Sequence, residues 1–176
     1  ADAEKMIGVY HYYIGNNLDA LEAYQSSLSF YDVKSAPIPH ANLLNNLGLV
    51  YAAMRQIPAA IRQYELAEPI YAEYGTEQDL IDIRHNIGGL YLRIERYDAA
   101  IEAFKAAMDL TPKHAALILN FVQVLIKHFK DTELPEHLET AGSALLRLKH
   151  IPEQHHQYKR LQHFNKLIAK LSTEQA

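Results

Sequence analysis

Histidine is the residue type in this sequence best suited to metal binding or acid–base chemistry, because imidazole ligates metals and titrates near neutral pH. Ten of the 176 residues are histidines, and His155, His156 and His163 lie close together near the C-terminal end. No carboxylate follows any of these three by three or four residues, and the chain has no HExxH motif. We therefore interpret them as surface histidines of a last helix.

Other reactive motifs are absent from the sequence as well. It contains no cysteine, no phosphate-binding glycine loop and no GxSxG nucleophile motif. We therefore expect a protein that is not an enzyme and that needs no metal and no other cofactor.

Three asparagines form a second group with chemical potential, since Asn46, Asn86 and Asn120 occupy the same position in successive copies of a repeat. A carboxamide has two N–H donors and two acceptor lone pairs. A row of carboxamides can therefore bond both the N–H and the C=O groups of an extended peptide, which recognises backbone rather than sequence. The alternative is that these asparagines serve solvation or contacts within their own helices.

The repeat that aligns these asparagines has a period of 40 residues. Its columns are Gly8, Gly48 and Gly88; Ala20, Ala60 and Ala100; Tyr24, Tyr64 and Phe104; and Ser27, Ala67 and Ala107. Small residues let two crossing helices approach closely, and an aromatic residue fills the wedge between the crossing helices and the next pair. The columns therefore predict stacked helical hairpins, each of which needs its neighbours to bury its apolar face.

The same columns resemble the consensus of the tetratricopeptide repeat (TPR), over residues 1 to about 130. The unit length is similar to that of the long-helix variety found in kinesin light chain and in bacterial peptide-sensing regulators. This resemblance implies an all-α fold, a right-handed superhelical solenoid of antiparallel hairpins. We expect one domain with units at about 1–40, 41–80, 81–114 and 115–150, a long turn around residues 130–132, and a capping or linker helix at about 153–172. That helix should carry its apolar residues on one side and its basic residues on the other.

The resemblance also implies a binding surface, because the first helix of each TPR hairpin lines a concave groove. In peptide-binding members of the long-repeat variety, asparagines at the position of Asn46, Asn86 and Asn120 hold the backbone of the ligand. The expected groove residues are Asn42, Asn45, Asn46, His85, Asn86, Arg93, Asn120, Gln123 and Lys127. Arg93 and Lys127 would suit an acidic side chain or a terminal carboxylate, or they are solvated surface charges. The carboxylate clamp that grips chaperone tails is matched poorly, since Val9 and Asp82 stand at two of its positions.

Composition narrows the class of partner. The formal net charge is −4, which gives no reason to expect nucleic-acid binding, and no apolar run is long enough to enter a membrane. We expect a protein or peptide partner and a cytoplasmic location, or a periplasmic one if a signal peptide has been removed. Three readings stay open at this point: a groove-binding module, a sensory segment of a larger bacterial signalling protein with a flanking domain, and a self-assembling scaffold that forms homo-oligomers.

Overall fold

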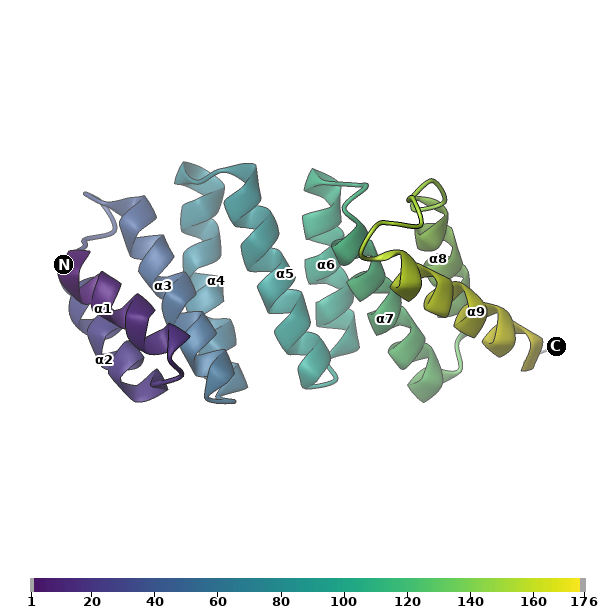
Figure 1. The fold of residues 1–176 in the computed structure, drawn as a ribbon, viewed down its shortest axis with the longest axis horizontal. Coiled ribbons are helices and arrows are strands. Elements are labelled where there is room, and N and C mark those ends of the chain that lie inside the picture. The colour runs from purple at the N-terminus through teal and green to yellow at the C-terminus, as the bar shows by residue number, and fades with distance from the viewer. Residues whose placement is uncertain (1, 175–176) are drawn as a thin grey trace. The chain divides into compact units, whose positions relative to one another are not determined.

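A computed structural model describes residues 2–174, which form nine α-helices and no strand (Figure 1). The helices are α1 (Asp2–Tyr13), α2 (Asn17–Leu28), α3 (Pro37–Ala53), α4 (Ile57–Tyr74), α5 (Glu77–Arg93), α6 (Tyr97–Leu110), α7 (Ala115–Thr132), α8 (Pro135–Leu146) and α9 (Tyr158–Glu174). The predicted all-α repeat fold is therefore confirmed. None of the described helices is both long and apolar enough to cross a membrane.

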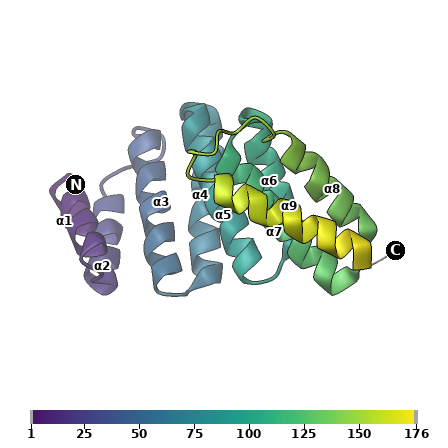
Figure 2. The ribbon, with the colours of Figure 1, turned by 45° about the vertical axis from the view of Figure 1, so that its right-hand side comes forward.

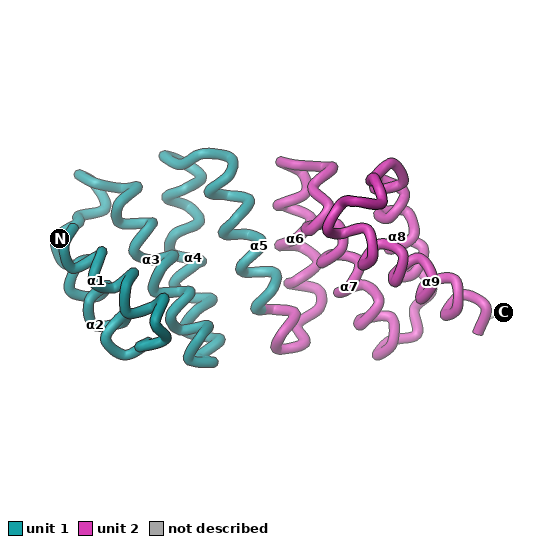
Figure 3. Tube along the Cα trace, viewed as in Figure 1, with its two compact units in different colours: residues 1–90 teal, residues 91–176 magenta. Residues whose placement is uncertain are grey.

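The described residues separate into two compact units, coloured separately in Figure 3. Unit 1 ends at Leu90 and unit 2 begins at Tyr91, so the division falls inside α5. Unit 1 contains the hairpins α1–α2 and α3–α4, and unit 2 contains α6, α7, α8 and α9.

The turns inside the first three hairpins repeat the same backbone geometry every 40 residues. Gly15, Arg55 and Glu95 have φ values of 78°, 60° and 60°, in the left-handed region. After each of them, the next N–H donates to a carbonyl five residues earlier, for example from Asn16 to His11 at 2.8 Å. This is the Schellman arrangement that ends a helix and satisfies its last carbonyls. The chain therefore leaves each first helix in the same direction.

The helices of a hairpin cross at the repeated glycine, as the sequence predicts. A Cβ atom placed on Gly8 would lie 2.7 Å from Cδ1 of Tyr24, and one on Gly48 would lie 2.6 Å from Cδ1 of Tyr64. Both rings are buried. Only glycine leaves room for the ring at these two crossings, which explains why a small residue and an aromatic residue recur together.

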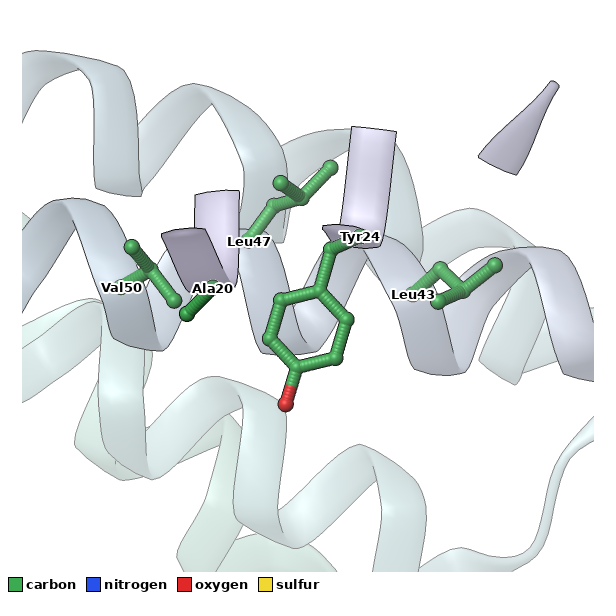
Figure 4. Packing of buried hydrophobic residues seen from close by; sticks show 5 residues of the cluster. All are labelled: Ala20, Tyr24, Leu43, Leu47 and Val50. Carbon is green, nitrogen blue, oxygen red and sulfur yellow. The ribbon is translucent and has the colours of Figure 1, made fainter. Parts of the chain in front are cut away.

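Neighbouring hairpins of unit 1 are joined by an apolar cluster between α2 and α3 (Figure 4). Ala20 and Tyr24 of α2 pack with Leu43, Leu47 and Val50 of α3, and all five are buried. The aromatic column thus fills its own hairpin and also contacts the next one. This double role makes the stacking of hairpins a condition for burying the core.

Unit 2 departs from the expected boundaries in two places. The prediction of a long loop around residues 130–132 is wrong, because these residues are still helical and end α7. The chain changes direction at Glu133, whose φ is 57°. The last helix begins at Tyr158 rather than near residue 153, after a loop with Pro152 that is held by short turn hydrogen bonds. Helix α9 lies against α7 and α8 (Figures 1 and 2).

Candidate functional site

The expected groove residues on α3 are Asn42, Asn45 and Asn46. Asn45 and Asn46 are half-buried and stand between the buried Leu44 and Leu47. Within the part of the chain that the structure describes, no group hydrogen-bonds the carboxamide of Asn45 or Asn46. Their donors and acceptors are therefore available to solvent or to a ligand.

Asn42 differs from its two neighbours because its carboxamide already has a partner. The hydroxyl of Tyr71 on α4 donates to Oδ1 of Asn42 at 2.7 Å. Burial, with smaller contributions from Asp79 and Asp82, raises the pKa of Tyr71 to about 12, so this phenol remains a donor at neutral pH. Asn42 therefore ties α3 to α4 through one acceptor, and its NH₂ group remains exposed.

Helix α5 carries the next expected pair, His85 and Asn86, and both are half-buried. The carboxamide of Asn86, like that of Asn46, has no hydrogen-bond partner within residues 2–174. Beside them, Nε of Arg84 donates to Oε1 of Glu68 on α4 at 2.7 Å, an ion pair that holds this part of α5 to α4. This contact joins α5 to α4 two residues before Asn86.

In unit 2 the expected residues Asn120 and Gln123 are brought together on α7 by a residue that sequence reasoning missed. Nη2 of Arg160 on α9 donates to Oδ1 of Asn120 and to Oε1 of Gln123, both at 2.7 Å. The guanidinium carbon also lies 5.6 Å from the centre of the Phe164 ring. Unlike Asn46 and Asn86, Asn120 is therefore engaged by a cation from the same chain.

The expected placement of the basic residues on the side of α9 opposite its apolar stripe is wrong for Arg160. Arg160 stands four residues before the buried Phe164, so it shares the inward side of the helix. Burial lowers the pKa of its guanidinium, which nevertheless stays charged at neutral pH. The spacing of four from Phe164 was the available signal for this placement.

The remaining expected residues, Arg93 and Lys127, are exposed in unit 2. They stay predictions.

The histidines do not assemble a metal centre in the described residues, where no group of three or more His, Asp or Glu side chains could hold a metal ion. His155 and His156 lie in the loop before α9 rather than on a helix, and their rings stack at 4.5 Å. A second stacked pair, His128 and His137, has ring centres 4.2 Å apart. These pairs act as packing elements in unit 2.

Comparison with known proteins identifies the repeat. The sequence model of the tetratricopeptide repeat family matches residues 39–113. These residues are tetratricopeptide repeats. The second and third members of each repeat column, such as Gly48 with Gly88 and Ala60 with Ala100, lie inside the matched segment.

Solved TPR structures share the fold over nearly the whole chain. A tetratricopeptide repeat protein from Parabacteroides merdae is 14% identical, with a TM-score of 0.78, over 98% of this chain and 60% of that chain. The kinesin light chain-like TPR repeats of Podosopora anserina are 14% identical, with a TM-score of 0.72, over 98% of this chain and 86% of theirs. The Cut9–Hcn1 structure of the APC/C is 23% identical, with a TM-score of 0.67, over 90% of this chain and 28% of that chain.

These identities show likeness of fold. The chain spans 60% of the Parabacteroides protein and 28% of the Cut9–Hcn1 chain. None of the curated proteins matches this sequence. The TPR fold generally mediates protein–protein interaction, and the kinesin light chain-like neighbour agrees with the long-repeat variety that the sequence resembles.

Proposed function

We propose that this TPR chain binds an extended peptide or partner segment whose backbone hydrogen-bonds the carboxamides of Asn46 and Asn86. The observation that carries the proposal is that these two amides are half-buried, lack a partner within residues 2–174, and occupy the same place in successive repeats. A half-buried amide without a partner gains free energy when a ligand supplies one and excludes water. Asn45 and His85 flank the same two positions and line the proposed site.

The expected trio of asparagines is reduced to a pair in this proposal. Asn120 and Gln123 already accept from Arg160, so a ligand would have to displace that guanidinium to use them. Asn42 contributes its exposed NH₂ group to the site. Arg93 and Lys127 belong to unit 2, so they are not counted as part of this site. The role is that of a binding module, without a chemical step.

The test uses peptides selected from a random library with the intact chain as bait, followed by calorimetric titration. Losing two hydrogen bonds of about 1 kcal/mol each weakens binding about 30-fold, and we expect this from Asn46→Ala/Asn86→Ala. Asn165→Ala is the matched control, because it removes an exposed carboxamide from α9. Unchanged affinity in a double variant of unchanged helicity rejects the proposal.

A second experiment separates backbone recognition from side-chain recognition. Replacing single amides of the selected peptide by N-methyl amides removes donors without altering side chains. We expect losses at two peptide positions that disappear in the Asn46→Ala/Asn86→Ala background. Equal losses in both backgrounds would show that other residues of the chain hold the peptide backbone.

A further inference from the structure

Helix α1 has an apolar stripe that the described structure leaves uncovered. Ala3, Met6, Ile7, Tyr10 and Tyr13 recur at steps of three and four and are all exposed. The four larger side chains range from 50% exposed for Ile7 to 82% for Tyr13. Opposite this stripe, Gly8 and Val9 face α2 and its cluster. Contiguous exposed apolar surface of this kind marks a site of interaction.

The equivalent residues of the next repeat, on α3, are covered by a packed helix. Forty residues after Ala3, Ile7 and Tyr10 stand Leu43, Leu47 and Val50. These three residues of α3 are at most 3% exposed, because α2 packs on them (Figure 4). The outer stripe of α1 is therefore the same kind of surface as the side of α3 that receives a helix.

The helix that covers α3 has a defined chemistry. Helix α2 presents Ala20 and, four residues later, Tyr24. The alanine lets the backbones approach, and the aromatic ring fills the space beside it. The same pair recurs as Ala60 with Tyr64 and as Ala100 with Phe104, so it is the signature of the second helix of a hairpin in this chain.

We propose that the stripe Ala3, Ile7 and Tyr10 is a docking surface for the second helix of a TPR hairpin that lies outside residues 2–174. The occupant presents a small residue followed four residues later by Tyr or Phe. Ile7 and Tyr10 take the places that Leu47 and Val50 hold against α2. This surface is separate from the asparagines of the proposed peptide site, so the two proposals stand or fall independently.

A second folded copy of the chain does not supply such a helix. Ala20, Tyr24, Ala60, Tyr64, Ala100 and Phe104 are all at most 3% exposed. Each copy therefore has its small–aromatic pairs already buried. By contrast, unit 2 provides a covering helix for its own last hairpin, since α9 lies on α7 and α8 through the buried Leu161 and Phe164. Covered ends are what keep a repeat array from associating, and α1 lacks such a cover among the described residues.

The experiment supplies the missing helix as a tandem copy of residues 1–40 placed directly before residue 1. The 40-residue period then brings the copied Ala20 and Tyr24 to Ile7 and Tyr10 of the original α1. We expect hydrogen exchange of the original α1 amides to slow at least tenfold and the melting temperature to rise. The matched control is the same tandem chain carrying Ile7→Glu and Tyr10→Glu in the original α1. In this control we expect neither the slower hydrogen exchange nor the higher melting temperature.

A second probe keeps the test decisive if the copied hairpin does not fold. A synthetic peptide of residues 15–31 is titrated into the full chain, and NMR shifts of Ile7 and Tyr10 are followed. Shifts with this peptide, and none with its Tyr24→Ala variant, support the proposal. No effect on α1 from either the tandem copy or the peptide overturns it. A wild-type dimer in sedimentation velocity that Ile7→Glu/Tyr10→Glu abolishes also overturns it, because a second copy would then be the occupant.

Discussion

Replacing Gly48 by alanine tests the packing of a TPR hairpin at its tightest point. The added methyl group would lie 2.6 Å from Cδ1 and 2.8 Å from Cζ of Tyr64, whereas carbon atoms in contact are normally about 3.5–4.0 Å apart. Tyr64 is 1% exposed, so its ring cannot swing into solvent. Overpacking of this kind costs about 1–3 kcal/mol, and alanine in place of a helical glycine returns about 0.5–1 kcal/mol.

The net expectation for Gly48→Ala is a destabilisation of about 1–2 kcal/mol, or about 2–8 °C in melting temperature for a chain of this size. Gly89→Ala is the matched control, since a Cβ there meets no heavy atom of the described residues within 4 Å. It should stabilise the protein by about 0.5–1 kcal/mol through helix propensity alone. Urea unfolding followed by circular dichroism at 222 nm measures both. If Gly48→Ala gains stability as Gly89→Ala does, the argument from close approach is refuted.

Two further perturbations address unit 2. Arg160→Ala removes the charged hydrogen bonds to Asn120 and Gln123. We therefore expect α9 to lose about 1–2 kcal/mol of local stability and its backbone amides to exchange hydrogen about tenfold faster. Lys159→Ala, which removes an exposed cation from the same helix, is the control. Equal exchange in both variants would mean that Leu161 and Phe164 alone hold the helix. Burial, and then the neighbouring imidazole of His128, lower the pKa of His137, so its neutral form favours the folded state. The stability that His137 contributes is therefore fully present above its ordinary pKa of about 6.5 and is lost as the pH falls through its lower pKa in the folded state. In urea titrations at pH 7.5 and 5.5, His137→Gln should show a smaller change in unfolding free energy between the two pH values than the unchanged protein. The same pH slope in His137→Gln would assign the dependence to other groups.

Much of the fold could be predicted from the sequence because repeat packing is local. A glycine on one helix and an aromatic residue 16 positions later, as in Gly8 with Tyr24, meet inside one hairpin, so their spacing reports the contact. The turn geometry followed the same period, although Arg55 and Glu95 have no intrinsic preference for the left-handed conformation that Gly15 adopts readily. At Arg55 and Glu95, the position in the repeat, rather than the residue type, therefore predicts the left-handed backbone conformation.

The candidate site was predictable only in part, because exposure depends on what lies across each surface. Asn46, Asn86 and Asn120 look alike in the sequence, yet Asn120 accepts from a residue 40 positions away on a helix that folds back after an irregular loop. Likewise, Ile7 and Leu47 occupy one repeat column, yet Ile7 is exposed and Leu47 is buried under α2. The sequence by itself determined the helical pairs and the residues at their crossings, since these contacts lie within one period. Only the tertiary structure decided which equivalent side chains are covered, because covering requires a helix from elsewhere in the chain, and its position depends on packing beyond the repeat.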